Sequence, residues 1–224
     1  MDQKSKDFLY KYLNNPSPTG FEEGGQRIWL DYMQPYIDDY ISEVSKKKIN
    51  VSLEIGFGSG ENLLNLINTS EKNRFFIGCE PYLNGLASFI SNLKVEKYKK
   101  IRLFKSDIRE LLLHFSKQIF DEIFILYPDP WPKARHEKRR ILNKENLNLF
   151  LSTLKINGKV FIATDVKNYF DSIYKLFESN VNVKIINFNN YHLRPKKIII
   201  TRYEKKALNK KIKPLYLEVK KILD

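Results

Sequence analysis

Apolar runs typical of β-strands alternate along this chain with amphipathic helical patterns, and this alternation restricts the fold more than any other feature. Strands are expected at Val51–Ile55, Arg74–Cys79, Ile101–Phe104, Asp121–Leu126, Lys159–Ala163, Val183–Phe188 and Lys197–Tyr203. Helices are expected at Glu61–Ile67, Leu83–Leu93, Ile108–Phe115, Asn143–Leu154 and Tyr169–Glu178. Alternation of this kind predicts an α/β layer fold with a mainly parallel sheet.

Length and composition limit the class of protein. The 224 residues have room for one sizeable core, and the single Cys79 excludes an internal disulfide framework. No apolar stretch reaches the roughly 18 residues that a membrane span needs, and the N-terminus lacks a signal-peptide pattern. A reducing cytoplasm is therefore the expected location, and the sequence leaves open whether the protein is a monomer or a homodimer.

Three glycines at alternate positions, Gly56, Gly58 and Gly60, follow the first strand and precede a helix. Glycine permits positive φ and lets the backbone approach a ligand closely. The dinucleotide fingerprint G-x-G-x-x-G would need glycine at position 61, where Glu61 stands, so a nicotinamide cofactor is disfavoured. A plain turn is the alternative interpretation of such a glycine loop.

Two acidic residues flank this loop in the expected fold. Glu54 precedes the glycines, and Glu80 ends the second strand, where an acid can bind ribose hydroxyls. These acids suit a ligand that carries hydroxyls and an amine rather than a pyrophosphate.

A proline-framed acid lies at the end of the fourth expected strand. Pro128, Pro130 and Pro132 restrict the backbone around Asp129, and Trp131 lies between two of them. Ligands bind at this edge of open α/β sheets, and an aromatic residue between prolines indicates a packed or stacking platform. A surface turn followed by a solvated basic helix is the alternative.

Basic residues dominate the charge, which is +13 overall, although residues 1–44 contain eight acidic residues against four basic ones. The basic groups are Lys46–Lys48, the cluster after Trp131, Arg194–Lys197 and the lysines between 205 and 213. Such an excess favours a polyanionic partner, with surface solvation as the alternative.

Together these segments resemble the tRNA (guanine-N7-)-methyltransferase family, the bacterial TrmB-like enzymes. The matching residues are Leu53–Gly60, Phe76–Glu80, Ser106–Asp107, Pro128–Lys133, Arg135–His136, Lys138–Arg140, Thr164–Asp165 and Thr201–Glu204. The resemblance implies a seven-stranded, Rossmann-like class I methyltransferase fold, mostly parallel, with helices on both faces and one antiparallel strand near the C-terminus. It also implies that S-adenosylmethionine is the cofactor and tRNA the partner.

The resemblance assigns roles to individual residues. Glu54, Gly56, Gly58, Gly60, Glu80, Asp107 and Asp129 would bind the cofactor. Lys133, Arg135, His136, Lys138, Arg139, Arg140, Asp165, Thr201, Arg202, Tyr203 and Glu204 would bind the substrate or RNA. For three of these residues a structural role stays open, because Asp165 could cap the next helix and Thr201 and Glu204 could lie at a strand end.

Asp129 is the expected catalytic residue. Guanine N7 has a lone pair and no proton, so its methylation needs positioning rather than a base, and it leaves a positive charge that a carboxylate can stabilise. A methyltransferase acting on another RNA or on protein, and a non-catalytic RNA-binding protein of the same fold, remain alternatives. Amine methylation is disfavoured, because Pro128–Trp131 replaces the Asn/Asp-Pro-Pro-Tyr signature.

The first 44 residues look different from the rest. The segments Phe8–Glu22 and Gly25–Tyr32 resemble the start of a glutamyl-aminopeptidase-type metallopeptidase, yet the chain lacks the His/Asp/Glu set of a two-metal site. We expect an acidic helical leader over residues 1–44, with helices at Ser5–Asn14 and Gly24–Tyr40 and no peptidase activity. The methyltransferase domain is expected over residues 45–224.

Overall fold

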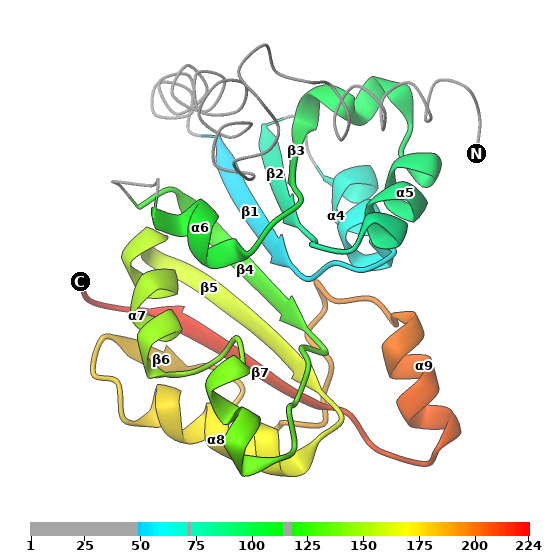
Figure 1. Cartoon of the computed structure of the whole chain (residues 1–224). Coiled ribbons are helices and arrows are strands. Elements are labelled where there is room, and N and C mark those ends of the chain that lie inside the picture. Colours follow the sequence, from blue (N-terminus) through cyan, green and yellow to red (C-terminus); the bar gives the residue numbers. More distant parts are fainter. Residues whose placement is uncertain (1–48, 71–72, 114–117) are drawn as a thin grey trace. The chain divides into compact units, whose positions relative to one another are not determined.

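The computed structural model describes residues 49–70, 73–113 and 118–224. The chain divides into two compact units, residues 1–114 and 115–224 (Figure 1). The leader expected over residues 1–44, with its two helices, lies outside the described residues.

The first unit contains three parallel strands, β1 (Asn50–Ile55), β2 (Arg74–Cys79) and β3 (Ile101–Phe104), with β2 between the other two. The helices are α4 (Glu61–Thr69), α5 (Leu83–Asn92), the 3-10 helix η3 (Val95–Lys100) and α6 (Ile108–Leu113). Val51–Ile55 and Phe75–Cys79 are buried throughout, as expected of parallel strands covered on both faces.

Helix α4 packs one apolar stripe, Leu63, Leu66 and Ile67, into the core of this unit. These positions share one helical face, so the helix can cover the sheet while Asn68 and Thr69 are exposed. The ring of Phe57, next to the glycines, lies 5.1 Å from that of Phe89 in α5. The segment after β1 is thereby anchored to the helix layer.

The second unit contains four strands, β4 (Phe120–Leu126), β5 (Leu154–Thr164), β6 (Val183–Ile185) and β7 (Leu215–Lys221). Strand β5 pairs with β4 in parallel and with β7 antiparallel, and β6 pairs with β7 antiparallel. The helices are η4 (Ala134–Arg139), α7 (Lys144–Thr153), α8 (Lys167–Glu178) and α9 (Arg202–Asn209).

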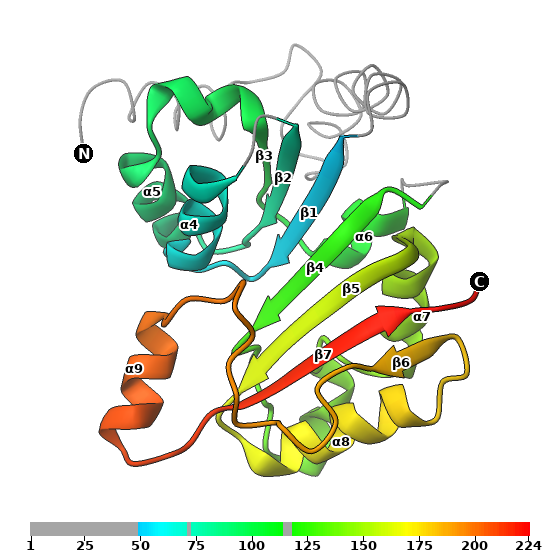
Figure 2. The same cartoon turned by 180° about the vertical axis from the view of Figure 1, so that it is seen from behind.

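Helices α7 and α8 cover the same face of these four strands, as the opposite views in Figures 1 and 2 show. The rings of Phe124 and Phe161 stack 4.9 Å apart on neighbouring strands of this core. Helix α9 lies away from that layer, beyond the ends of β4 and β5 (Figure 2).

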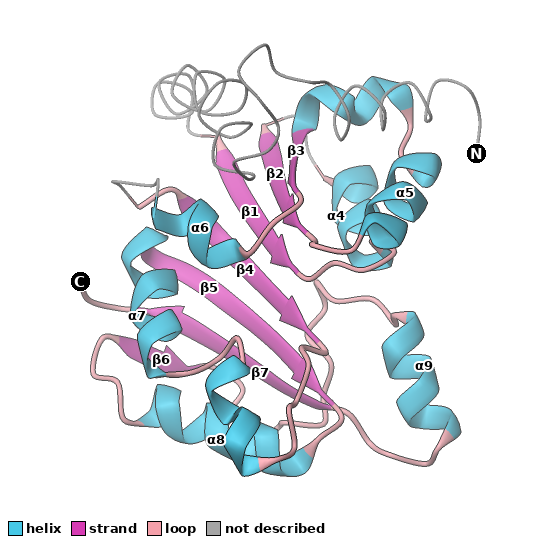
Figure 3. Cartoon of the chain, viewed as in Figure 1, coloured by secondary structure: helices cyan, strands magenta, loops and turns pink. Residues whose placement is uncertain are grey.

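The predicted fold class is confirmed. The seven strands follow the order β3-β2-β1-β4-β5-β7-β6, and β7 is the antiparallel strand expected near the C-terminus (Figure 3). In the part of the chain that the structure describes, no helix is long and apolar enough to cross a membrane.

The C-terminal elements differ from the prediction. Lys197–Tyr203 was expected to be a strand, but Arg202 and Tyr203 open helix α9, and the last strand is Leu215–Lys221. The side chain of Thr201 caps α9, and this local hydrogen bond ends the extended segment. Strand β6 is also shorter than the expected Val183–Phe188.

Candidate active site

The loop between β1 and α4, which we call the cofactor loop (Gly56–Gly60), has all three glycines at positive φ: 65° at Gly56, 57° at Gly58 and 77° at Gly60. A Cβ at Gly60 would lie 2.2 Å from the ring of Phe89, so packing requires this glycine. A Cβ at Gly56 would meet nothing within 4 Å. Gly56 is exposed, so the loop leaves room for a ligand to approach the backbone here.

Glu80 ties the cofactor loop to the loop after β2. Its carboxylate accepts hydrogen bonds from the backbone N–H of Gly58 at 2.7 Å and of Tyr82 at 2.9 Å, and the residue is buried. Each carboxylate oxygen keeps a lone pair that can accept a hydrogen bond from a hydroxyl group. Glu80 is thus fixed where a ribose could bind.

Glu54 is buried at the end of β1, and the side-chain N–H of Asn62 donates a hydrogen bond to it at 2.9 Å. Burial raises the pKa of Glu54 to about 8. The hydrogen bond from Asn62 lowers this pKa in part, and the negative charge of Glu61 raises it slightly. A cationic amine placed beside Glu54 would favour the ionised form. This environment fits the amine end of S-adenosylmethionine.

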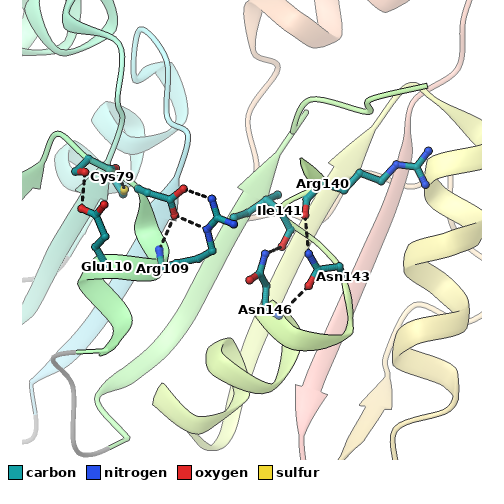
Figure 4. A network of polar contacts seen from close by, with 9 residues as sticks. Cys79, Arg109, Glu110, Arg140, Ile141, Asn143 and Asn146 are labelled. Atoms are coloured by element: carbon teal, nitrogen blue, oxygen red, sulfur yellow. Dashed lines mark hydrogen bonds and ion pairs between the residues drawn. The ribbon is translucent and has the colours of Figure 1, made fainter. Parts of the chain in front are cut away.

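Asp107 lies half-buried between β3 and α6 and accepts hydrogen bonds at 2.8 Å from both the backbone N–H and Nε of Arg109 (Figure 4). These bonds hold the pKa of Asp107 below its usual range despite partial burial. Nearby, the thiol of Cys79 donates to the carbonyl of Ser106 at 3.1 Å. The ionised, oriented Asp107 remains suited to accept a hydrogen bond from an adenine amino group.

The open space at Gly56 leads to a prediction. Gly56→Ala should fold, at a cost of about 1 kcal/mol for a left-handed alanine, but lose S-adenosylmethionine affinity because the methyl group would occupy ligand space. Isothermal titration calorimetry measures the affinity and urea unfolding measures the stability. Gly158→Ala in β5 is the control, since its Cβ would lie 2.8 Å from Leu154 and should lower stability without touching the cofactor loop. Unchanged cofactor affinity in Gly56→Ala would place the ligand elsewhere.

In the second unit, the residues Tyr127–Pro132 form what we call the proline loop. It follows β4, and the exposed Asp129 lies between two residues with positive φ, Tyr127 at 54° and Trp131 at 41°. The backbone N–H of Tyr127 donates to the carbonyl of Ala163 at 2.7 Å. The prolines exclude the right-handed helical region for the residues before them, but the left-handed conformation could not be predicted from the sequence.

A cationic and aromatic surface follows the proline loop. The guanidinium of Arg139 lies 5.0 Å from the Trp131 ring, and His136 approaches the same ring edge-on at 5.8 Å. The other exposed basic residues of this surface are Lys133, Arg135 and Lys138. Arg140 differs, because it is buried.

Thr201 and Glu204 lie at the start of α9, where the hydroxyl of Thr201 accepts from the N–H of Glu204 at 3.3 Å. The alternative that they mark a strand end with a surface charge is wrong, because both side chains are buried. Arg194 donates to Glu204 Oε1 at 2.8 Å, whereas Oε2 has no hydrogen-bond partner among the described residues. The hydroxyls of Tyr127 and Tyr216 lie beside the same buried carboxylate.

Aromatic residues surround this carboxylate. The Tyr127 ring stacks 6.3 Å from that of Tyr203, and the guanidinium of Arg202 lies 5.0 Å from the Tyr203 ring. Burial is the main cause that raises the pKa of the Tyr127 hydroxyl, and the electrostatic effects of the nearby Tyr216 and Glu204 raise it further. Neither Tyr127 nor Arg194 was predicted from the sequence to be a site residue, although Tyr127 directly precedes the first proline of the loop.

Asp165 follows β5 and is half-buried. The alternative that it caps the next helix is wrong, since Val166 occupies the N-cap position of α8 and the hydroxyl of Thr164 accepts the N–H of Val166 at 3.2 Å. Asp165 lies at the same end of the second unit's parallel strands as the proline loop.

Comparisons with known proteins identify the family. The family model described as "Putative methyltransferase" matches residues 48–216. The chain is 35% identical over 181 residues to "tRNA (guanine-N(7)-)-methyltransferase" of Wolbachia pipientis wMel, covering 80% of this chain and 78% of the relative. It is also 35% identical to a "Bifunctional methyltransferase" of Rickettsia conorii, with 89% of this chain and 38% of that longer protein aligned.

Among solved structures, the 16S rRNA methyltransferase KamB has a TM-score of 0.60 at 12% identity, covering 84% of this chain and 94% of that chain, which supports the fold alone. The family model and the Wolbachia relative carry the assignment. The chain belongs to the tRNA (guanine-N7-)-methyltransferase family.

Proposed function

We propose that this protein transfers a methyl group from S-adenosylmethionine to N7 of a guanine in tRNA, in the variable loop. The observation that carries the proposal is the 35% identity, over 80% of the chain, to a relative named for this activity. Two sets of residues support it: the first unit offers acids around an open glycine loop, and the second offers an acid beside a cationic, aromatic surface.

The cofactor supplies an electrophilic methyl group on a sulfonium. Glu54 pairs with its amine, Glu80 accepts the ribose hydroxyls and Asp107 accepts the adenine amino group. Gly56, Gly58 and Gly60 let the backbone come close to the ligand, as the open space at Gly56 allows. Glu61 in the first turn of α4 makes that helix end unfavourable for a pyrophosphate.

Asp129 acts on the guanine, with contact to the cofactor as a second role. Attack by N7 needs no general base, because the nitrogen has a free lone pair, so catalysis depends on positioning. The imidazole ring of the base becomes cationic as the methyl group arrives, and the Asp129 carboxylate stabilises this developing charge. The exposed position of Asp129 leaves it accessible to a base.

The remaining residues hold the RNA. Lys133, Arg135, His136, Lys138 and Arg139 face phosphates, and Asp165, Thr201, Arg202, Tyr203 and Glu204 contact the guanine or its surroundings. The exposed ring of Tyr203 offers a stacking surface for the base. The protein works in the cytoplasm, as a monomer or a homodimer, and light scattering distinguishes these two states.

Residues 1–44 form a leader without peptidase activity, and residues 45–224 form the methyltransferase domain. The family match beginning at residue 48 supports this boundary. Deleting residues 1–44 should therefore leave methyl transfer measurable.

The test is methylation of bulk tRNA with labelled S-adenosylmethionine, followed by mass spectrometry of the nucleosides. The label should appear in 7-methylguanosine. Label at an exocyclic nitrogen or a ribose hydroxyl, or label only in ribosomal RNA or protein, would support another methyltransferase activity. RNA binding without any transfer would support the non-catalytic alternative.

A prediction on RNA binding concerns Arg139, whose exposed guanidinium lies over Trp131. Arg139→Ala should weaken tRNA binding and reduce the slope of log affinity against log salt by about 0.7 to 0.9, the loss of one phosphate contact. Filter binding at several salt concentrations measures the slope. Lys175→Ala, an exposed charge in α8, is the control and should leave it unchanged.

A further inference from the structure

Arg140 ends the basic run after the proline loop, but its side chain turns inward. Its Nε donates to the carbonyl of Pro130 at 2.8 Å, and Nη2 lies 3.4 Å from the carbonyl of Trp131. Nη1 pairs with Glu137 at 3.1 Å, and the guanidinium lies 5.0 Å from the Tyr169 ring. Only 8% of the residue is exposed, so little of this guanidinium is available to a phosphate.

The backbone at Arg140 is held just as firmly. The side-chain N–H of Asn143 donates to the carbonyl of Arg140 at 3.0 Å, and Asn143 caps α7 by accepting from the N–H of Asn146 at 2.9 Å (Figure 4). Asn146 in turn donates to the carbonyl of Ile141 at 2.9 Å. Arg140 therefore connects the proline loop to the start of helix α7.

The proline loop needs such a support. Tyr127 and Trp131, on either side of Asp129, both have positive φ, a strained conformation for residues other than glycine. A strained conformation persists only where neighbouring groups enforce it. The bond to Ala163 holds the loop at Tyr127, and the guanidinium of Arg140 holds the two carbonyls at its other end.

We propose that Arg140 is a positioning residue that holds Asp129 in place for methyl transfer, and that it does not bind RNA phosphate. The planar guanidinium suits this task, because its donors can reach two successive carbonyls at once. A lysine has one charged nitrogen and cannot span both carbonyls in the same way. The role in turnover rests on the proposed function, whereas the support of the loop does not.

The loop itself can be tested without activity. Trp131 is one of two tryptophans in the chain, so Trp29→Phe leaves it as the only tryptophan fluorophore. In this background, Arg140→Ala should increase acrylamide quenching of Trp131, and added ethylguanidinium should reverse the increase, whereas ethylammonium should not. Unchanged quenching in Arg140→Ala would overturn the proposal.

Turnover provides the second test. Arg140→Ala should lower kcat on the order of a hundredfold, because small misplacements of a catalytic group have effects of this size, while the KM for tRNA and the salt slope stay unchanged. Ethylguanidinium should restore kcat in part. Arg139→Ala should show the opposite pattern, a raised KM and a shallower salt slope.

The outcomes separate the two proposals. If Arg140→Ala raised the KM for tRNA and made the salt slope shallower at unchanged kcat, Arg140 would be a phosphate ligand and the inference would fail. If the wild-type protein did not methylate tRNA, the proposed function would fail. The quenching experiment would still test whether Arg140 holds the proline loop in place. Circular dichroism checks that Arg140→Ala folds. If it does not fold, Arg140→Lys replaces it in both tests, and the same loss of kcat is expected.

Discussion

Asp129→Asn should slow methyl transfer about a hundredfold while tRNA and cofactor still bind. Asparagine keeps the shape of aspartate and most of its hydrogen-bonding capacity, but it removes the negative charge that stabilises the cationic base. Loss of one preorganised electrostatic group costs on the order of 3 kcal/mol in the transition state. Single-turnover kinetics at saturating S-adenosylmethionine and tRNA measures this step directly.

The alternative role of Asp129 predicts a different result. If Asp129 mainly holds the cofactor, the variant should raise the dissociation constant of S-adenosylmethionine by a comparable factor and leave the saturated rate near the wild-type value. Asp171→Asn is the control, because it makes the same chemical change in helix α8, where Asp171 pairs with Lys167 outside the candidate site. A near-wild-type saturated rate in Asp129→Asn would remove this residue from catalysis.

Local patterns were sufficient to predict the parts of the fold that depend on local physics. The strand before the glycines, Val51–Ile55, and the helix after them were both found within a few residues of their predicted bounds, because buried parallel strands and amphipathic helices have distinct periodicities. The positions of Glu54, Glu80 and Asp129 at strand ends followed from the same alternation.

The C-terminal region was harder to predict. The run Ile198–Ile200 has a strand-like composition, yet Thr201 stops it with a cap bond to Glu204. The true last strand, Leu215–Lys221, carries three charged residues that conceal its buried positions. Its place in the sheet depends on pairing with β5, far away in the sequence, which a local pattern does not encode.

The candidate site showed the same limit. Arg139 and Arg140 are identical neighbours in the sequence, and only the fold separates an exposed guanidinium over Trp131 from a buried one on the loop carbonyls. The pairing of Arg194 with Glu204 depends likewise on a loop that returns to α9. The sequence identifies Arg139 and Arg140 as cationic, but only their burial in the fold shows which one can contact RNA and which one supports the loop.

Glu54 connects the stability of the fold to cofactor binding. Burial raises its pKa to about 8 from an ordinary 4.5, so between these pH values the folded protein keeps a proton that the unfolded chain releases. The unfolded state is then favoured as pH rises, and stability should fall from about pH 4.5 to about pH 8. At pH 7 this penalty is on the order of 3 kcal/mol.

Glu54→Gln should therefore stabilise the unliganded protein at neutral pH. Glutamine resembles the protonated acid and can still accept the hydrogen bond from Asn62, so the variant should be about as stable as wild type near pH 4 and more stable by up to about 3 kcal/mol at pH 7. Urea unfolding at pH 5, 6, 7 and 8 measures the difference. Glu96→Gln, an exposed carboxylate in η3, is the control and should leave the pH dependence unchanged.

Glu54→Gln should also bind S-adenosylmethionine roughly 10- to 100-fold more weakly. The variant loses a hydrogen bond between a charged carboxylate and the cofactor amine, and such a bond is worth about 1.5–3 kcal/mol. In the wild-type protein, the cofactor amine should stabilise ionised Glu54, so binding near pH 7 should release a proton. Calorimetry in buffers of different ionisation enthalpy measures that release, which Glu54→Gln should abolish. A variant that was more stable and yet bound the cofactor with unchanged affinity and proton release would show that Glu54 supports the fold alone.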